Sequence, residues 1–347
     1  MKITGSAFWY LILLIIIGLP ALTAAGEAQN AFNEGVKLYR AGKFKEAIAA
    51  YDRAAKAAPE AAEPYNNRGL AYYKLGQNDI AITNYDTAIK LNPKFTEALF
   101  NRANAYSSQK QYERAVKDYD EIIKQNPKTP RAYDLRADAY MNLGEFEKAI
   151  ADFNQAQKLA PKDPDIYYNR GSAQLGRKDY AAAVKDFNEA IKQNPKVSRA
   201  HGQRGRAYYG LGEFEKAIED FNQAQKLAPK DPDIYYSRGL AYRRLGKHEE
   251  AVRDYTEAIK LNPKNAETYN NRANVHSLMG KYDLAVKDYD EAIKLDPKNA
   301  RIYANRGMIK LRQGKNEEAQ KDFVKALELD PGLKEQLDPM IGPASKR

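Results

Sequence analysis

Six asparagines are spaced at multiples of 34 residues along this chain of 347 residues. They are Asn33, Asn67, Asn101, Asn169, Asn271 and Asn305. An amide side chain has an acceptor oxygen and two donor hydrogens, so it can hold both a C=O and an N–H group of an extended main chain. The spacing therefore suggests peptide-backbone binding. The alternative is that these amides solvate a helix face or bond within the chain.

Aromatic side chains accompany the amides. Most of the 25 tyrosines fall at regularly spaced positions where a buried ring is expected. Another set falls on the same face as the asparagines, which we expect to be exposed: Tyr39, Tyr73, Phe100, Tyr168, Tyr209 and Tyr236. Amides interleaved with rings would suit an extended peptide of mixed sequence.

The elements that position these residues follow a 34-residue period marked by nine evenly spaced prolines, from Pro59 to Pro331. The period predicts nine repeats: 28–61, 62–95, 96–129, 130–163, 164–197, 198–231, 232–265, 266–299 and 300–333. Each repeat has Gly or Ala at position eight, Ala at position twenty and Tyr or Phe at position twenty-four. Glycine at position fifteen in seven repeats, and the proline, are helix stops, so each repeat is predicted to form helix, turn, helix.

This pattern, seen in PYNNRGLAYYKLGQNDIAITNYDTAIKLNP, resembles that of the tetratricopeptide repeat family. The resemblance implies an all-α fold, an α-α superhelix built as a solenoid of antiparallel helix pairs. It also implies that the first helices line an inner groove, with positions two, five, six, nine, twelve and thirteen facing a ligand. The asparagines at position six are similar to the asparagine ladder in the repeats of O-linked N-acetylglucosamine transferase, which grips peptide backbone.

Charged residues also recur with the period, and the net charge is +10. Arginine occupies position seven in repeats two to nine, and aspartate occupies position twenty-three in repeats three to nine. Repeat one lacks both, having Glu34 and Ala50, which favours an ion-pair ladder over a track for a polyanion. Lysines recur at the end of the second helix, where cations complement the helix dipole. A nucleic-acid partner is therefore not expected.

The sequence contains no recognisable catalytic motif. It has no cysteine, no glycine-rich phosphate loop, and three separated histidines, His201, His248 and His276, without metal-ligand spacing. We therefore expect no enzyme activity, no cofactor and no metal site. The carboxylate clamp of chaperone-binding family members is also missing, because Asn104 and Asn274 at position nine follow Phe100 and Asn270 rather than lysine.

The first 25 residues, MKITGSAFWYLILLIIIGLPALTAA, have the layout of a secretory signal peptide cleaved after Ala25. An uncleaved anchor is the alternative, since Ala7 to Ala25 could just span a membrane. We expect an exported, periplasmic or otherwise extracytoplasmic, bacterial scaffold that binds protein or peptide partners in its groove. The alternative is an inner-membrane-anchored accessory subunit of an envelope secretion, polysaccharide or division complex.

The tail of residues 334–347 is too short for a domain. Only Lys334 to Leu337 can be helical before the breaker Asp338-Pro339. Stacked repeats normally end in a covering helix, so repeat nine is expected to be incompletely covered. Self-association through Ile309, Leu311 and Val324 would be one consequence.

Overall fold

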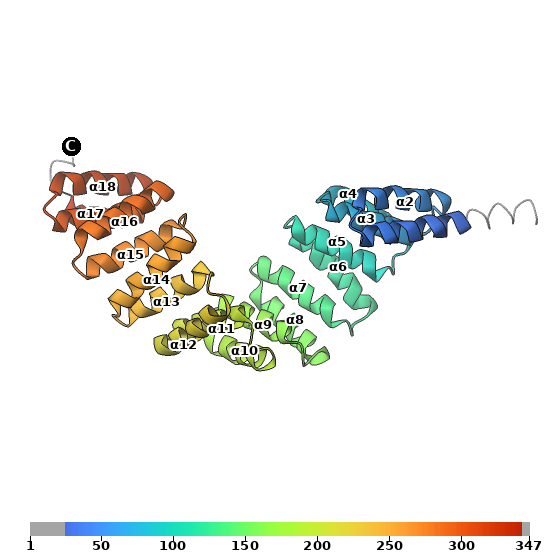
Figure 1. Ribbon diagram of the computed structural model, residues 1–347, viewed down its shortest axis with the longest axis horizontal. Coiled ribbons are helices and arrows are strands. Elements are labelled where there is room, and N and C mark those ends of the chain that lie inside the picture. The colour runs from blue at the N-terminus through green and yellow to red at the C-terminus, as the bar shows by residue number, and fades with distance from the viewer. Residues whose placement is uncertain (1–24, 342–347) are drawn as a thin grey trace, which may run out of the picture. The chain divides into compact units, whose positions relative to one another are not determined.

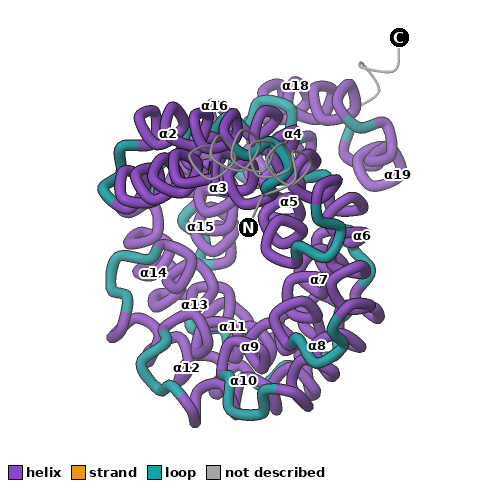
Figure 2. The backbone as a smooth tube through the Cα atoms, turned by 90° about the vertical axis from the view of Figure 1, so that its right-hand side faces the viewer, coloured by secondary structure: helices purple, strands orange, loops and turns teal. Residues whose placement is uncertain are grey.

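The computed structural model describes residues 25–341. Within this range the chain is helical, with short loops and turns between helices and no strand (Figure 2). The predicted signal peptide or anchor therefore lies almost wholly outside the described residues. No helix between residues 25 and 341 has the length and apolar composition to cross a bilayer.

Two helices fall in each 34-residue period, so the helix count is consistent with nine repeats (Figure 1). The first helices are residues 25–40, α3 (Ala62–Lys74), α5 (Thr96–Ser108), α7 (Pro130–Asn142), α9 (Pro164–Gly176), α11 (Ser198–Leu211), α13 (Pro232–Arg244), α15 (Ala266–Leu278) and α17 (Ala300–Arg312). The second helices are α2 (Phe44–Ala57), α4 (Asn78–Leu91), α6 (Tyr112–Gln125), α8 (Phe146–Leu159), α10 (Tyr180–Gln193), α12 (Phe214–Leu227), α14 (His248–Leu261), α16 (Tyr282–Leu295) and α18 (Asn316–Leu329).

The described residues divide into two compact bodies, an N-terminal body that ends at Ala173 and a C-terminal body that begins at Gln174. Within each body the helices of a pair pack together, and second helices contact the first helix of the next repeat, as α4 does with α5 and α12 with α13. First helices of consecutive repeats also touch, as α3 does with α5 and α15 with α17. In each body the first helices thus form one continuous surface.

A ring packed on a small residue closes each helix pair, as the sequence predicted. Tyr51, Tyr85, Phe221, Tyr255 and Phe323 are at most 1% exposed. A Cβ added to the position-eight glycine facing each of these rings would lie 2.5–2.8 Å from a ring carbon. The spacing is tighter than a methyl group accepts without movement, and the opposing alanines at position twenty are fully buried. The two helices therefore approach as closely as their backbones and rings allow.

The turn between the two helices requires a left-handed residue. All seven position-fifteen glycines have φ between 71° and 81°. Lys110 and Lys178 adopt the same conformation, with φ of 60° and 65°. In repeat three the Lys110 N–H bonds to the Ser107 carbonyl and the Gln111 N–H to the Tyr106 carbonyl, at 2.9 and 2.8 Å, as in a Schellman motif. Repeats three and five thus keep the left-handed turn, although positive φ is unfavourable for a residue with a Cβ.

The C-terminal end corrects one expectation. Helix α19 is Lys334–Leu337, as predicted, but the chain continues through a 3-10 turn at Asp338–Met340. Leu337 is fully buried against Phe323 and Ala326, Met340 and Ile341 pack on the same cluster, and Gln320 Nε2 bonds to the Met340 carbonyl at 2.7 Å. Ile309 is buried in the cluster that contains Ile302 of the same helix and Tyr289 of α16, not on a free end. Leu337 therefore covers more of repeat nine than expected, but Leu311 is only half-buried and Val324 is 40% exposed, so the expectation of incomplete cover is correct only in part.

Replacing Lys110 with glycine should stabilise the protein by about 0.5–1 kcal/mol, because glycine adopts positive φ without the steric cost of a Cβ. The free energy of unfolding, measured by urea titration and circular dichroism, checks this. The reverse change, Gly144→Lys, should lower it by a similar amount. Equal stability of Lys110→Gly and the parent chain would show that the turn carries no strain.

Candidate functional site

The arginines at position seven form the predicted ladder. Six of them make two hydrogen bonds to the position-twenty-three aspartate of their own repeat. The pairs are Arg102–Asp118, Arg136–Asp152, Arg204–Asp220, Arg238–Asp254, Arg272–Asp288 and Arg306–Asp322. In repeat two, where the aspartate is replaced, Arg68 Nε bonds to Asn84 at 2.6 Å. The arginines are therefore structural groups.

Each ladder arginine also binds the repeat before its own, a contact that the sequence analysis missed. Its third nitrogen donates to position twenty-five of the preceding repeat, 16 residues earlier, as in Arg102 to Asp86 at 2.6 Å and Arg204 to Asn188 at 2.6 Å. Aspartate, asparagine or threonine fills this position from repeats one to eight. Hydrogen bonding to Asp152 raises the pKa of Arg136 above its ordinary value, with Asp120 adding to it. The ladder therefore joins repeats as well as helices.

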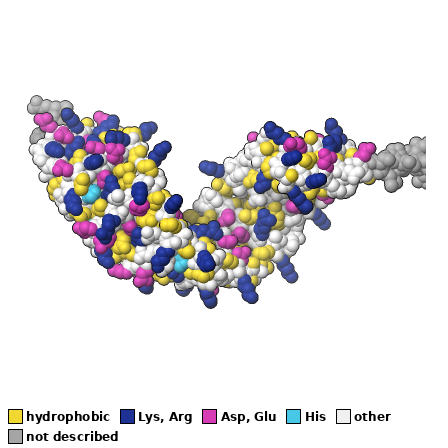
Figure 3. All heavy atoms as spheres, in the orientation of Figure 1, with side chains coloured by type: hydrophobic (Ala, Val, Ile, Leu, Met, Phe, Trp, Pro, Cys, Tyr) yellow, Lys and Arg dark blue, Asp and Glu magenta, His cyan; other side chains and the backbone are white. Residues whose placement is uncertain are grey.

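Lysines lie outside this ladder on an exposed edge. Lys124, Lys260 and Lys294 sit near a glutamate three residues earlier, and over the face drawn in Figure 3 basic and acidic side chains alternate within each body. Interspersed charge of both signs offers no continuous phosphate track.

The asparagines lie on the surface formed by positions two, five, six, nine, twelve and thirteen of the first helices, which we call the first-helix face. Four of them donate their amide hydrogen to position five of the preceding repeat, 35 residues earlier. The contacts are Asn101 to Asn66, Asn169 to Asp134, Asn271 to Tyr236 and Asn305 to Asn270, at 2.9–3.3 Å. Where position five is Phe100, position six of the next repeat is Leu135, and both pack on one apolar cluster. In these five cases the residue at position six therefore joins two repeats, by a hydrogen bond to a polar residue at position five of the preceding repeat or by apolar packing with Phe100.

The two remaining asparagines differ from each other. Asn67 accepts a hydrogen bond from Asn66, which is fully buried and also bonds to Asn101. Asn33 is exposed, and its oxygen accepts from the exposed Gln29 at 3.0 Å. Replacing Asn67 and Asn101 together would strip a buried amide of its partners, so these two changes would disturb folding as well as any ligand. Asn33 can be replaced without that effect.

The aromatic residues of the face are half-buried rather than exposed. Tyr39 and Tyr209 pack edge-on against Phe44 and Phe214, each at 5.3 Å between ring centroids. Tyr73 and Phe100 pack on the apolar cluster around Tyr85 and Tyr119.

In the C-terminal body Tyr236 joins a polar network of this face. Its hydroxyl donates to Glu267 at 2.6 Å and accepts from Asn271 at 3.0 Å. Tyr168, which lies in the N-terminal body, is also half-buried, and its main-chain carbonyl accepts a hydrogen bond from the Ser172 hydroxyl. The rings of this face thus offer edges and hydroxyls, not whole faces, to a ligand.

A pair of carboxylates on α7 was not singled out from the sequence. Asp134 and Asp138 lie one helical turn apart on the first-helix face, and Asp134 accepts from Asn169 at 3.2 Å. Burial, together with a smaller effect of the Asp134 charge, raises the pKa of Asp138 to about 7. Burial likewise raises the pKa of Asp134, with smaller effects from Asp163 and Asp165. The position-five and position-nine spacing was the signal that would have found this pair.

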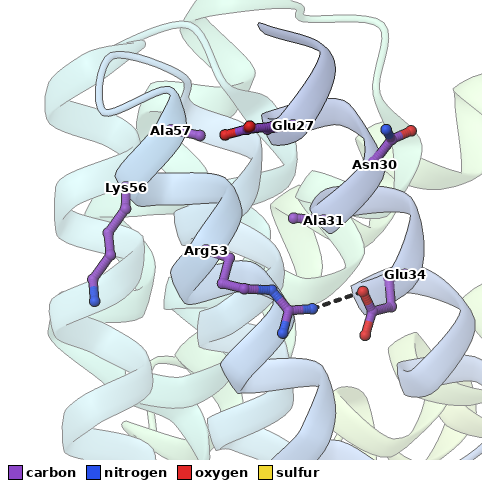
Figure 4. Close-up of a pocket in the computed structure, with 7 residues that line it drawn as sticks. All are labelled: Glu27, Asn30, Ala31, Glu34, Arg53, Lys56 and Ala57. Carbon is purple, nitrogen blue, oxygen red and sulfur yellow. Dashed lines mark hydrogen bonds and ion pairs between the residues drawn. The ribbon is translucent and has the colours of Figure 1, made fainter. Parts of the chain in front are cut away.

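An open cavity of about 780 Å³ lies at the outer side of repeat one (Figure 4). Its lining residues are Glu27, Asn30, Ala31, Glu34, Arg53, Lys56 and Ala57. Glu34 stands where the other repeats have the ladder arginine, and it pairs with Arg53 at 2.6 Å. Both side chains are more than half exposed, so the pair is weak and the cavity is a polar end surface.

No set of three or more histidine, aspartate or glutamate side chains in residues 25–341 is arranged to hold a metal ion. His201 instead contacts Asp220 and the Pro195 carbonyl at 3.4 and 3.3 Å. Tyrosines at the same repeat position make the equivalent carbonyl contact, as in Tyr235 to Pro229. Burial lowers the pKa of His276, which keeps it neutral in the core.

Comparisons with known proteins identify the repeat. A family profile described as TPR repeat matches residues 35–76, 69–110, 205–246 and 239–280. Two profiles described as Tetratricopeptide repeat match 96–129, 266–299 and 300–333, and 135–198. No match was found among curated protein sequences.

Solved structures share the fold. A tetratricopeptide repeat protein from Parabacteroides merdae is 21% identical, with a TM-score of 0.59 over 72% of this chain and 98% of that one. The C-terminal part of a TPR repeat-containing protein from Cytophaga hutchinsonii is 20% identical, with a TM-score of 0.55 over 69% and 98%. The APC/C hetero-tetramer Cut9-Hcn1 is 12% identical, with a TM-score of 0.56 over 86% and 59%.

A double-mutant cycle should separate the two acidic partners of one ladder arginine. Asp118 is 6% exposed and Asp86 is 52% exposed. Arg102→Ala and Asp118→Ala should therefore couple by about 1–3 kcal/mol. The Arg102–Asp86 cycle should show less than about 1 kcal/mol. Free energies of unfolding from urea titration test both cycles, and additive effects of Arg102 and Asp118 would contradict the ladder.

The pH dependence of stability should report on Asp138. Its pKa is about 7 in the folded chain and about 3.9 when unfolded, so the folded state binds the proton more tightly. Stability should therefore fall as pH rises from about 4 to 7, by about 1–3 kcal/mol relative to Asp138→Asn. Urea titrations at pH 5 and pH 7.5 measure the difference. Parallel pH profiles for the two proteins would mean that Asp138 is solvated.

Proposed function

The chain belongs to the tetratricopeptide repeat family, and from that premise we propose that it is a non-catalytic scaffold that binds protein or peptide segments on its first-helix face. One observation carries the proposal: positions that build the fold are nearly constant, whereas positions two, five, nine, twelve and thirteen of this face change from repeat to repeat. Position twenty is alanine in all nine repeats, while position five is aromatic, amide, acidic or small. Variable surface residues on a constant fold are suited to recognising a specific partner.

Different stretches of the face have different chemistry. In the N-terminal body the face carries the half-buried rings of Tyr39, Tyr73 and Phe100 and the exposed amide of Asn33, and Asp134 and Asp138 add carboxyl groups in repeat four. In the C-terminal body Tyr209 and Tyr236 stand with Arg206 and Arg244. The face of each body therefore offers its own chemistry to a partner: rings with carboxyl groups in the N-terminal body, and rings with arginines in the C-terminal body.

The position-six asparagines can bind a ligand with the amide hydrogens and oxygens that the contacts between repeats do not use. An amide has two donor hydrogens and an acceptor oxygen, and the contact to the preceding repeat uses one donor hydrogen of Asn101, Asn169 and Asn305. The second hydrogen and the oxygen can meet the backbone of a bound segment. The exposed Asn33 keeps more of its capacity, so repeat one is the place where an amide most directly serves a ligand.

We further propose that the scaffold acts outside the bacterial cytoplasm, after export directed by residues 1–25. The sequence pattern of that segment supports the proposal. The second version is an anchored accessory subunit of an envelope complex, in which the same segment stays in the inner membrane. Cell fractionation with N-terminal sequencing separates them: a soluble chain starting near Gly26 supports export, and an intact Met1 in the membrane pellet supports the anchor.

Site-specific photo-crosslinking tests the binding face. Repeat eight has exposed leucines on both of its helices, including Leu278 (64%) at position thirteen of the first-helix face and Leu284 (47%) on the second helix. A benzoylphenylalanine at Leu278 should crosslink to a partner segment in cells, because this side chain faces the proposed ligand. The same probe at Leu284 is the matched control and should crosslink far less. Equal crosslinking at both sites, or crosslinking from Leu284 alone, would place the binding surface elsewhere.

A further inference from the structure

Five repeats carry tyrosine instead of phenylalanine at position twenty-four, and their hydroxyl groups differ in a way that packing does not explain. The residues are Tyr51, Tyr85, Tyr119, Tyr255 and Tyr289, each at most 1% exposed. The ring fills the same place as Phe153, Phe187, Phe221 and Phe323 in the other repeats. The hydroxyl is therefore an addition that the core does not require.

Three of these hydroxyls meet side chains of the first-helix face. Tyr119 donates to Asn104 at 3.1 Å and Tyr289 donates to Asn274 at 2.6 Å, both asparagines at position nine. The Tyr51 hydroxyl lies near the side chain of Asn67, at position six of the next repeat: burial raises the pKa of Tyr51, and Asn67 lowers it by a smaller amount. The phenol oxygen at position twenty-four thus lies just beneath the first-helix face.

The other two hydroxyls, of Tyr85 and Tyr255, have no hydrogen-bond partner among the described residues and are closed off from solvent. Position nine is leucine in both repeats, Leu70 and Leu240, so the asparagine that pairs in repeats three and eight is missing. An unpaired buried hydroxyl is unfavourable, and phenylalanine would remove that cost. Two repeats nevertheless keep it.

The side chains above these hydroxyls are half-buried members of the face. Tyr39 and Tyr73 lie near Tyr85, close enough to add to the effect of burial, which raises the pKa of that phenol. Tyr236 packs on Tyr255 at 6.1 Å between centroids, and Leu240 packs on the same cluster. Burial raises the pKa of Tyr255 as well, so both phenols remain protonated donors. Side-chain rotation at the surface would bring a ligand atom into reach.

We propose that the Tyr85 and Tyr255 hydroxyls are donors for main-chain carbonyl oxygens of an extended peptide bound on the first-helix face. This inference rests on the proposed function and deepens it. A neutral carbonyl fits Tyr85 because the neighbouring side chains Tyr39, Tyr73 and Leu70 carry no positive charge to balance a desolvated carboxylate. The two donors give the scaffold one backbone anchor in each body.

Conservative tyrosine-to-phenylalanine changes separate this role from a structural one. Tyr85→Phe and Tyr255→Phe should leave the thermal midpoint unchanged or raise it, because they remove an unpaired buried group. Tyr119→Phe and Tyr289→Phe are the matched controls and should lower it, because each leaves an asparagine without its donor. A lower midpoint for Tyr85→Phe and Tyr255→Phe would show that their hydroxyls are already paired in the free protein, and would overturn the proposal.

Binding is measured with peptides selected from a random phage-displayed library against the full chain, using fluorescence anisotropy. Tyr85→Phe or Tyr255→Phe should weaken a selected peptide about tenfold, whereas Tyr119→Phe should not. Replacing one peptide carbonyl by a thiocarbonyl should weaken binding to the parent chain and have little effect on the phenylalanine variant that has lost the matching donor. This last result identifies a main-chain oxygen and not a side-chain carboxylate.

The outcomes distinguish this inference from the proposed function. Peptides that block crosslinking from the Leu278 probe, but bind the parent chain and the Tyr85→Phe/Tyr255→Phe double variant equally, would overturn the hydroxyl proposal and leave the binding face in place. Dependence on a peptide carboxylate side chain, with no effect of any thiocarbonyl, would also overturn it. Failure to select any peptide that blocks this crosslinking would remove both proposals.

Discussion

The contact between the ring at position twenty-four and the small residue at position eight sets the distance on which the rest of each repeat depends. With glycine at position eight, a Cβ would already come within 2.5–2.8 Å of the ring, so the two helices are held at their closest approach. Position seven lies next to this contact on the first helix. The short separation lets its arginine span to position twenty-three in a two-bond fork, which is the geometry that guanidinium and carboxylate groups prefer.

The ladder that results explains why a chain of net charge +10 need not bind polyanions. Each arginine donates hydrogen bonds to its own repeat and to the repeat before it, as Arg306 does to Asp322 and to Asp290. The first repeat departs from this chemistry with the Glu34–Arg53 pair, and the last has Val324 where an acceptor would stand. Repeat nine is instead closed by Leu337. The ladder therefore begins and ends within the nine repeats.

The first-helix face combines recognition with cohesion between repeats. An amide at position six is held by position five of the repeat before, and a tyrosine hydroxyl at position twenty-four is held from position nine. In the repeats that have these bonds, four at position six and two at position twenty-four, they orient side chains that would otherwise lose rotamer entropy on binding a ligand, so a partner meets a partly organised surface. They also mean that a loss of binding in a face variant must be compared with its stability before it is read as loss of a contact.

The sequence by itself determined the all-helical repeat, the helix ends, the buried rings and the arginine–aspartate pairs. All of these depend on spacings inside one 34-residue hairpin, where the helical period dictates which residues face each other. Tertiary structure decided the contacts between repeats: the bond from Asn169 to Asp134, the second partner of Arg102, the half-burial of Tyr39, the cover made by Leu337 and the unpaired hydroxyls of Tyr85 and Tyr255. These depend on the angle and offset at which one helix pair packs on the next and on the rotamers chosen there, neither of which a period within one pair specifies.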